Sequence, residues 1–437
     1  MGVGTISVLV PLYQSEMAPK WIRGTLVCAY QLAITFGILV AAVVNNSSKN
    51  IIGAAAYRIP IATQLVWASI LFLGLIILPE TPRYLIKRER HTSAAASLSR
   101  IRRLDITHPA LIEELAEIEA NHEYELSLGP STYRDVFSGS PHLGRRVLTG
   151  CGLQMLQQLS GCNFIFYYGT TFFQGKGLAS PFALQMITNG VNVASTLPGM
   201  VFVETWGRRP LLLFGAAGMA VSQLIVAIVG SALPSSNDAN MVLISFVCIY
   251  IFFFASSWGP TTWVVTSEIY PLKVRAKSMS ISTASNWLFN FGLGYATPYM
   301  IDSGYANLQA KVFFVWGTCC IFGFFFVWAM VYETSKISLE QIDELYERVD
   351  HAWQSTNFQP SWSFQDIRDE TTAGTSSGVS LADREAARRR ATAEAAPANS
   401  TDSDRITVSA DGSQVSTTAM SEEDKIIASL GDVDFSL

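Results

Sequence analysis

The sequence predicts an all-α integral membrane protein, and three observations support this prediction. Only 15% of the 437 residues are charged, against about 25% in soluble globular proteins, and 49% are hydrophobic. The charges gather in short junctions, in the segment Glu80–Arg146 and in the C-terminal tail. The stretches between them are almost free of charge, and many reach the roughly 20 apolar residues that a helix needs to cross a bilayer.

Nine apolar runs are candidate membrane spans. Eight are long enough to cross the hydrocarbon, and the shorter Gly2–Leu12 is expected to be part of a span. The eight are Gly24–Asn45, Ile59–Leu78, Val147–Phe173, Pro181–Val203, Pro210–Leu233, Asn240–Ser267, Met279–Met300 and Val312–Tyr332. Lysine and arginine gather in alternate connections, which the positive-inside rule places in the cytoplasm together with the C-terminus. We expect the plasma membrane as the location.

One apolar run carries an unusual set of polar side chains. The run Gly150–Tyr168 has no charge but contains three glutamines, an asparagine and two adjacent tyrosines. Amides inside hydrocarbon need hydrogen-bonding partners, so they face a bundle interior or a watery cavity. Neutral donors and acceptors beside aromatic rings suit a neutral, hydroxyl-rich solute better than an ion. The alternative is that these amides only join helices to one another.

The spacing within this run predicts a break in the helix. Asn163 and Tyr167 are four residues apart and share a helix face. Gln158 and Asn163 are five residues apart, which turns them roughly 140° away from each other on a regular helix. These side chains can converge on one solute only if the helix unwinds near Ser160-Gly161, as helices do around the midplane sites of transporters.

The cysteines and histidines exclude several kinds of site. All six cysteines lie in or beside apolar runs without the spacing of a zinc site, which favours packing roles. All five histidines lie outside the apolar runs, which argues against a histidine proton relay or an intramembrane metal. The sequence also has no His-Glu-x-x-His motif, no nucleotide-binding glycine-rich loop and no nucleophile paired with a base. We therefore expect no enzyme activity, no catalytic residue, no metal or cofactor, and no nucleic-acid partner.

Two junctions of the chain read alike and indicate an internal repeat. The segment Ser15–Arg23 aligns with Ser267–Arg275, 252 positions later, and Glu80-Thr81 aligns with Glu333-Thr334 at nearly the same offset. Two matches at one offset indicate two related halves, as in transporters with parallel repeats. At this offset the counterpart of the start of the second half lies about 105 residues before Met1. We therefore expect three helices of the first half to precede this sequence.

Four motifs together resemble the sugar porters of the major facilitator superfamily. They are Gln157-Gln158-Leu159-Ser160-Gly161-Cys162-Asn163 followed by Phe166-Tyr167-Tyr168, Pro79-Glu80-Thr81-Pro82-Arg83-Tyr84-Leu85, Glu204-Thr205-Trp206-Gly207-Arg208-Arg209, and Trp258-Gly259-Pro260-Thr261-Thr262-Trp263 with Ser267-Glu268-Ile269-Tyr270-Pro271. The resemblance covers Gly2 to about Tyr346. The ending Glu333–Glu340 and the Ser/Thr-rich tail are most similar to fungal hexose transporters, although Ser335-Lys336 departs from the usual Lys-Gly.

The resemblance implies a major facilitator fold with nine of its twelve helices present. Residues 1–79 are then the remainder of the N-terminal half-bundle (helices 4–6), and residues 147–332 are the C-terminal half-bundle (helices 7–12). A cytoplasmic linker with amphipathic helices, 80–146, joins the halves. A cytoplasmic segment, 333–357, leads into a tail, 358–437, whose composition and lack of apolar periodicity predict disorder.

The resemblance also nominates side chains that bind substrate. Gln31 matches a fifth-helix glutamine of the family, and Asn192 an eighth-helix asparagine. Trp263, after Gly259-Pro260, would stack on a sugar ring, although its position alone favours an interfacial anchor. For the polar residues the alternative is helix packing. The complete expected set is Gln31, Gln157, Gln158, Asn163, Tyr167, Asn192, Trp263, Asn286 and Asn290.

Charged residues at the helix ends form a second set. Glu16/Arg23 and Glu268/Arg275 share the same spacing in both halves, and Glu204/Arg208 lies at a third junction. Ion pairs there can hold neighbouring helices in one state until the halves rock around a fixed site. The alternative is charges that only anchor helix ends. The complete expected set is Glu16, Arg23, Glu80, Arg83, Glu204, Arg208, Glu268 and Arg275.

The function that the resemblance implies is transport of a monosaccharide, a hexose such as glucose, by alternating access. The expected partners are the sugar, the lipid bilayer and protons. Proton coupling is not assigned to any residue, because the first-helix aspartate and fourth-helix arginine of proton-coupled members would both lie before Met1. Two alternatives stay open: a sugar sensor with a transporter-like core, and an inactive truncated gene product.

Overall fold

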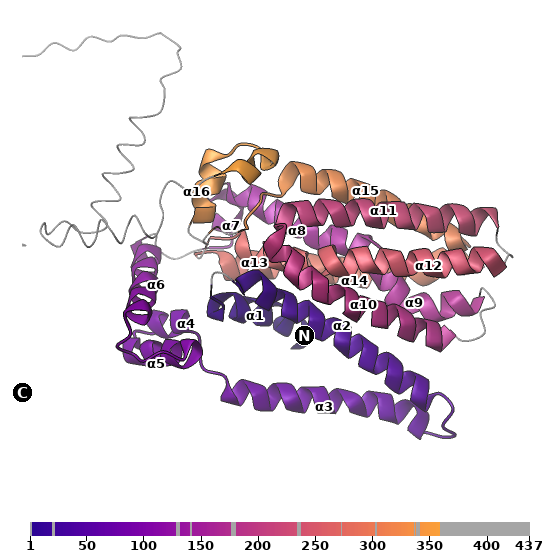
Figure 1. Cartoon of the computed structure of the whole chain (residues 1–437), viewed down its shortest axis with the longest axis horizontal. Coiled ribbons are helices and arrows are strands. Elements are labelled where there is room, and N and C mark those ends of the chain that lie inside the picture. The colour runs from indigo at the N-terminus through magenta and orange to yellow at the C-terminus, as the bar shows by residue number, and fades with distance from the viewer. Residues whose placement is uncertain are drawn as a thin grey trace, which may run out of the picture. The chain divides into compact units, whose positions relative to one another are not determined.

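The computed structural model contains only helices among the residues it describes (Figure 1). The described residues are 2–19, 22–127, 132–139, 142–175, 181–233, 237–271, 273–301, 304–335, 337 and 341–358. The expected disordered tail, 358–437, lies outside them except for its first residue.

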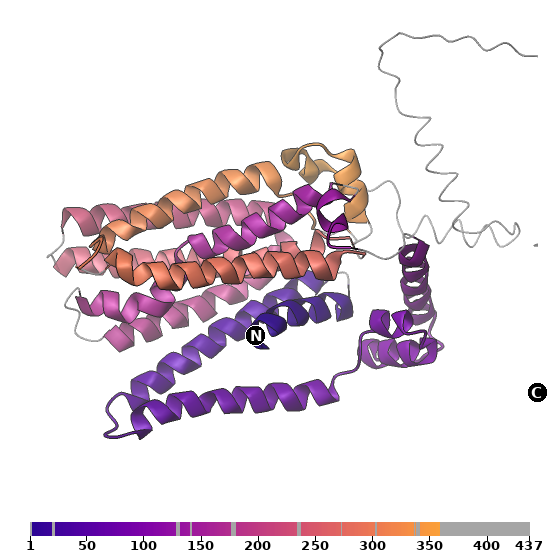
Figure 2. The ribbon, with the colours of Figure 1, turned by 180° about the vertical axis from the view of Figure 1, so that it is seen from behind.

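Long helices run side by side in one bundle, and Figure 2 shows the same arrangement from behind. They are α1 (Gly2–Met17), α2 (Arg23–Ser48), α3 (Ala55–Ile77), α8 (Leu143–Leu159), α9 (Cys162–Gly175), α10 (Pro181–Thr205), α11 (Arg208–Ala232), α12 (Asn237–Phe253), α13 (Gly259–Glu268), α14 (Arg275–Ile301) and α15 (Val312–Met330). A π-helix, η2 (Phe254–Trp258), joins α12 to α13, and a 3-10 turn, η3 (Gln309–Lys311), precedes α15.

Six segments of the described chain are helical, long enough and apolar enough to cross a membrane. They are Arg23–Ser48, Ala55–Ile77, Ala183–Thr205, Arg208–Ala232, Ala239–Glu268 and Gln309–Met330. Each corresponds to a span that the sequence predicts. The predicted span Val147–Phe173 is instead two short helices, α8 and α9, and the predicted span Met279–Met300 lies within the more polar α14.

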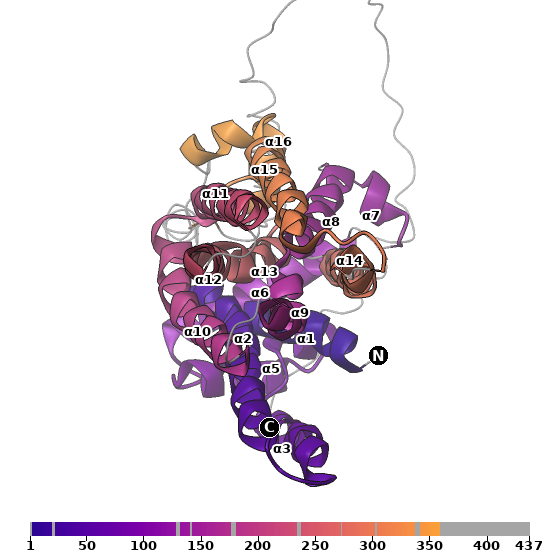
Figure 3. The same ribbon diagram turned by 90° about the vertical axis from the view of Figure 1, so that its right-hand side faces the viewer.

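The main hydrophobic core lies among α8 to α15. Trp258 is its largest fully buried side chain, and its indole Nε1 donates to the Leu212 carbonyl at 2.9 Å. Gly215 on α11 lets η2 approach closely, since an added Cβ would lie 2.6 Å from the Ser257 Cβ. Seen along the bundle, α11 lies beside α15 and α12, and α3 lies at the edge (Figure 3). No residue of α3 is buried, so it contributes little to this core.

We call the end of the bundle that holds Arg23, Arg208 and Arg275 the junction end, and the opposite end the far end. The helix α2 contacts the C-terminal bundle mainly near the junction end. All but one of its buried residues lie in its first half, from Arg23 to Thr35. There Val27 and Cys28 pack in a small apolar cluster with residues of α10, α11 and α13.

Short helices gather at the junction end. They are α4 (Pro82–Lys87), α5 (His91–Arg102), α6 (Pro109–Ser127), α7 (Asp135–Ser138), α16 (Gln341–Arg348) and the 3-10 turn η4 (Ala352–Asn357). Arg102 on α5 joins two of these helices to the bundle. Its guanidinium contacts Glu114 on α6 at 2.6 Å and donates to the carbonyl of Met17, at the end of α1, at 3.1 Å. The sequence predicts an amphipathic helix over Pro109–Glu125 with an apolar face of Leu111, Ile112, Leu115 and Ile118, and α6 covers these residues. Leu111 is buried and Leu115 and Ile118 pack inward, whereas Ile112 is exposed.

Candidate functional site

The predicted helix break is present between α8 and α9. Helix α8 ends at Leu159 and α9 begins at Cys162. Gly161 adopts a φ of +85°, in the left-handed region that glycine occupies without strain. Its missing side chain also matters, because an added Cβ would lie 2.6 Å from the Trp316 ring. Glycine is therefore required at this position on two independent grounds.

The break leaves the Ser160 carbonyl without its partner in a continued helix, and two buried side chains take that place. Gln223 Nε2 donates to the Ser160 oxygen at 2.6 Å, and the Tyr250 hydroxyl donates to it at 3.0 Å. Such partners are needed because an unsatisfied carbonyl in hydrocarbon costs several kcal/mol. The unwound turn is therefore built into the packing of α11 and α12.

Amide side chains from α8 and α14 meet directly beside this break. Gln157 Nε2 donates to the carbonyls of Trp258 and Gly259, both at 3.0 Å, where η2 passes into α13. Asn286 Nδ2 donates to Gln157 Oε1 at 3.0 Å and to Gln154 Oε1 at 2.7 Å. All three amide side chains are buried. We call Gln154, Gln157 and Asn286 the inner amide group.

A second group of amides lies one turn closer to the far end. Asn163 Nδ2 donates to Gln158 Oε1, and Asn290 Nδ2 lies 3.4 Å from the same oxygen. Asn290 also lies 3.4 Å from the hydroxyl of Tyr167, whose side chain is half exposed. Bonds at 3.4 Å are weak, so a ligand hydroxyl can replace them at low cost. We call Gln158, Asn163, Tyr167 and Asn290 the outer amide group.

Sequence reasoning missed Gln154, which is completely buried and donates to Thr266 Oγ1 at 3.3 Å. The signal was available, because Gln154, Gln157 and Gln158 are spaced three and four residues apart and share one helix face.

Gln31 lies close to the inner amide group. An added Cβ on Gly259 would lie 3.3 Å from Gln31 Nε2, so α2 approaches the start of α13 at this glycine. A π-helix immediately before Gly259-Pro260 interrupts the regular helix there. Such interruptions are frequent at functional sites. Gly259 therefore brings Gln31 from the first half of the chain near the carbonyls that Gln157 contacts.

Trp263 does not lie with the amides. It is buried in the apolar cluster between α2 and α10, and its ring makes an edge-on contact with Tyr30 at 5.3 Å. In this conformation its indole packs between the two parts of the chain.

Asn192 is buried on α10, and within the described part of the chain its side chain makes no hydrogen bond to either amide group. Its side-chain oxygen, and that of Asn189, have no hydrogen-bond partner among the described residues. Buried amide oxygens usually have a partner. Both oxygens are therefore available to a hydroxyl donor.

At the junction end, Arg208 lies at the centre of a buried ionic network. Its Nη2 contacts Glu268 Oε1 at 2.9 Å, and its Nη1 contacts Glu204 Oε2 at 3.1 Å. Thr334 Oγ1 donates to the other Glu268 oxygen at 2.7 Å. The sequence paired Glu268 with Arg275, and the structure corrects this: Glu268 contacts Arg208, and Arg275 Nε donates to the Tyr270 carbonyl. The reason is that Arg275 lies across a turn, at the start of α14.

The same network holds the first half of the chain. The Thr25 backbone N–H donates to Glu204 Oε1 at 3.2 Å, and Thr25 Oγ1 donates to the Met200 carbonyl at 3.2 Å. Gly24 allows this approach, since an added Cβ would lie 2.8 Å from the Arg208 guanidinium. Helix α2 is therefore fixed to α10 at the junction end.

Glu333 is a further member that sequence reasoning did not place in the ionic set. Its carboxylate accepts the backbone N–H groups of Arg208 at 3.0 Å and Arg209 at 2.9 Å, at the N-terminus of α11. A carboxylate there satisfies free N–H groups and complements the helix dipole. The internal repeat aligns Glu80, a member of the expected ionic set, with Glu333, so the repeat could have identified Glu333 as well.

The remaining charged candidates lie elsewhere at this end. Glu16 is half-buried at the end of α1, and Arg23 is buried at the start of α2. Glu80 is exposed, and its carbonyl accepts a bond from Ser97 Oγ, while Arg83 is half-buried in α4.

Comparison with known proteins agrees with this architecture. The sequence pattern of the family described as "Sugar (and other) transporter" matches residues 1–346. The chain belongs to this sugar transporter family. It is therefore an all-α integral membrane protein of the major facilitator fold, in a family of transporters rather than enzymes.

The chain is also similar to individual sugar transporters and sensors and to a solved transporter structure. The chain is 66% identical, over 84% of its length, to a protein named as a probable glucose transporter of Neurospora crassa, and it spans 64% of that protein. It is 44% identical over 80% of its length to a high glucose sensor of Saccharomyces cerevisiae and spans 46% of it. The proton:xylose symporter XylE from E. coli, bound to 6-bromo-6-deoxy-D-glucose, superposes with a TM-score of 0.68 at 27% identity, over 79% of this chain and 72% of that one.

Proposed function

We propose that this protein moves a monosaccharide, a hexose such as glucose, across the bilayer by alternating access. The observation that supports it most is the pair of amide groups beside the break at Gly161. They gather neutral donors and acceptors from α8, α9 and α14, which is the chemistry that a ring of hydroxyls needs. The inner group is buried and bonded closely by the protein, whereas the bonds of Asn290 in the outer group are long and Tyr167 is exposed. The sugar would therefore bind first at the outer group.

The two ends of the bundle support the alternating-access part of the proposal. At the junction end, Thr25 and the Arg208 network hold α2 against the C-terminal bundle. Beyond Thr35 only Ser48 of α2 is buried, so the same helix is loosely packed toward the far end. This arrangement is that of a transporter closed at one end, and separation of Thr25 from Glu204 would open that end.

The proposal includes an orientation and a division of the chain. The basic junctions and the C-terminus face the cytoplasm, and the membrane is the plasma membrane. Residues 1–79 belong to the N-terminal half-bundle, 147–332 to the C-terminal one, and 80–146 and 333–357 are cytoplasmic. Protons are a further proposed partner, supported by the likeness to a proton:xylose symporter. Hexose uptake that falls as the external pH rises would support this coupling to protons.

Uptake of labelled glucose by cells that lack their own hexose transporters tests the function. The parent chain should give saturable uptake, and Gln158→Ala, at a residue of the outer group, should lower its affinity. Phe322→Ala is the control, because Phe322 is an exposed side chain on α15, away from the amides. Absence of saturable uptake by a chain that reaches the membrane would contradict the proposal.

A sugar sensor is the second candidate, favoured by the 44% identity to a high glucose sensor. A sensor binds sugar without moving it. The two candidates are separated by measuring glucose binding to the purified chain beside uptake in cells. Binding without uptake would favour the sensor.

A further inference from the structure

A row of aromatic rings follows α14 from the outer amide group to the far end. Phe291, Tyr295 and Tyr299 are spaced four residues apart and so lie on one helix face. Their ring centres are 6.4 Å apart for Phe291 and Tyr295, and 5.4 Å apart for Tyr295 and Tyr299. Tyr305 adds a fourth ring 4.9 Å from Tyr299. We call these four residues the aromatic row.

The chain after α14 is folded back so that Tyr305 reaches this row. The Ala306 N–H donates to the Tyr299 carbonyl at 3.2 Å, and the Leu308 N–H donates to the Met300 carbonyl at 2.9 Å. These two bonds hold the turn against the last turn of α14. The backbone thus places Tyr305 beside Tyr299 at the end of α14.

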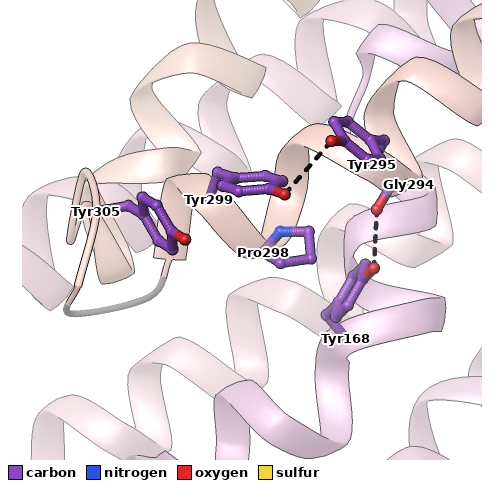
Figure 4. Close-up of a pocket in the computed structure, with 6 residues that line it drawn as sticks. All are labelled: Tyr168, Gly294, Tyr295, Pro298, Tyr299 and Tyr305. Carbon is purple, nitrogen blue, oxygen red and sulfur yellow. Dashed lines mark hydrogen bonds between the residues drawn. The ribbon is translucent and has the colours of Figure 1, made fainter.

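Pro298 and Tyr168 complete a cavity beside the row (Figure 4). Proline has no N–H and cannot donate the usual helical hydrogen bond to the residue four positions earlier. The carbonyl of Gly294 therefore lacks this bond. The Tyr168 hydroxyl from α9 donates to this carbonyl instead, at 2.8 Å. An added Cβ on Gly294 would meet nothing within 4 Å, so the face beside it is open. Tyr168 is thereby held as one wall of a space of about 420 Å³.

We propose that this cavity is a second, outer binding subsite for a hexose, through which the sugar passes on its way to the amide groups. The proposal rests on the proposed function. A pyranose has an apolar C–H face that stacks on aromatic rings, and a rim of hydroxyls that can meet the hydroxyls of Tyr168, Tyr295 and Tyr299. Tyrosine supplies both contacts from one rigid side chain. The cavity is within the roughly 300–1,000 Å³ of small-molecule sites.

The position of the row favours a sugar path over a lipid contact. Tyrosines that anchor a protein in lipid lie at one depth, at the headgroups. From Phe291 to Tyr299 the row rises eight residues, about 12 Å along the helix axis. Its inner end is adjacent to Asn290 of the outer amide group, and Tyr168 is adjacent to Tyr167 of the same group. Helices α9 and α14 therefore carry both the cavity and members of the outer amide group.

Saturation-transfer NMR of glucose with the purified full chain in glycoside-free lipid nanodiscs tests the subsite. In Gln158→Ala a residual glucose signal should persist, since the outer subsite is intact. A variant that combines Gln158→Ala with Tyr295→Ala and Tyr299→Ala should lose this residual signal. Replacing both tyrosines with Phe in place of Ala should retain most of the signal, because the rings remain. Phe322→Ala, at an exposed ring on α15, should change nothing. Mannitol, which has no rigid C–H face, should give little signal.

The outcomes separate the subsite from the amide site. Loss of all signal in Gln158→Ala, or a residual signal that survives both tyrosine-to-alanine changes, would overturn the subsite and leave the amide site standing. A signal that depends on the tyrosines but not on Gln158 would support the subsite and count against the amide site. No signal in the parent chain would overturn both. In uptake, Tyr299→Ala should raise KM by roughly fivefold with little change in maximal rate.

Discussion

The guanidinium of Arg146 lies 4.1 Å from the ring centre of Tyr346, and both side chains are buried. Arg146 extends from α8 and Tyr346 from α16, 200 residues later in the chain. The same guanidinium contacts Asp343 and donates to the Ile269 carbonyl at 3.3 Å. A buried arginine charge needs such partners. The pair therefore fixes α16 to the junction end of the C-terminal bundle.

We expect Tyr346→Ala to lower the free energy of unfolding by roughly 3–5 kcal/mol, because a buried ring and a cation–π contact are lost together. Tyr346→Phe is the matched control. It keeps the ring, and the Tyr346 hydroxyl has no hydrogen-bond partner among the described residues. Thermal unfolding in nanodiscs should show a large loss for alanine and a small one for phenylalanine. Equal losses would show that the ring contact with Arg146 is not what stabilises this end.

Tyr346 also predicts a dependence of stability on alkaline pH. Burial raises the pKa of its phenol above the usual value of about 10, and Arg146 offsets this only in part. The folded chain thus holds the proton more tightly than the unfolded chain. The contribution to stability is complete below pH 10 and is lost as the pH rises above it. The melting temperature of the parent should fall more steeply than that of Tyr346→Phe as the pH rises above about 10. Parallel curves would contradict this assignment.

The ionic network predicts unequal effects for its two acids. Glu268 is buried and accepts bonds from Arg208 and Thr334, whereas Glu204 is partly exposed. Glu268→Gln should cost roughly 3–5 kcal/mol, because Arg208 loses its buried carboxylate. Glu204→Gln, which leaves the Arg208–Glu268 contact intact, should cost about 1 kcal/mol. Chemical unfolding of the two variants measures the difference, and equal costs would argue against a buried Arg208–Glu268 core.

Much of this architecture could be predicted from the sequence, because apolar length and charge placement are local properties. The break at Ser160-Gly161 followed from the angle between Gln158 and Asn163, and α8 and α9 confirm it. Partners were harder to predict. Spacing paired Glu268 with Arg275, but Glu268 contacts Arg208, since the fold brings the start of α11 to the end of α13.

The amide site could also be predicted only in part. Composition located the amides, yet the division into an inner and an outer group depends on which helix faces them. Gln157 reaches the carbonyls of Trp258 and Gly259 because a π-helix distorts the chain there. Gly259-Pro260 predicts a kink there, because proline removes a backbone donor and glycine relaxes the helix, but not which carbonyls the kink presents to Gln157. Trp263 likewise packs against Tyr30, a contact that depends on how α2 meets α13.

Gly161 provides a direct test of the helix break. Gly161→Ala should destabilise the protein by roughly 1–3 kcal/mol through its positive φ alone, with a further cost from the contact with Trp316. Gly292→Ala is the control, because it lies in α14 and an added Cβ meets nothing within 4 Å. It should be neutral or stabilise by about 0.5–1 kcal/mol. Thermal unfolding compares the two, and similar melting temperatures would mean that the turn at Ser160-Gly161 tolerates a side chain.

Gln157 and Gln158 are adjacent in the sequence and should respond differently to substitution. Gln157 is bonded to Trp258, Gly259 and Asn286, so Gln157→Ala leaves buried groups unpaired. It should cost about 1–3 kcal/mol of stability. Gln158 shares its oxygen with Asn163 and Asn290, the latter at 3.4 Å, so Gln158→Ala should cost less.

Glucose should separate the two variants further. Because the outer group meets the sugar before the inner group does, Gln158→Ala should lose most of the thermal stabilisation that glucose gives the parent chain. Gln157→Ala should start from a lower melting temperature and keep a measurable shift with glucose, since its outer group is intact. The measurement is the melting temperature of each variant with and without saturating glucose, with mannitol as the matched polyol. A full glucose shift in Gln158→Ala would mean that Gln158 joins helices and does not bind the sugar.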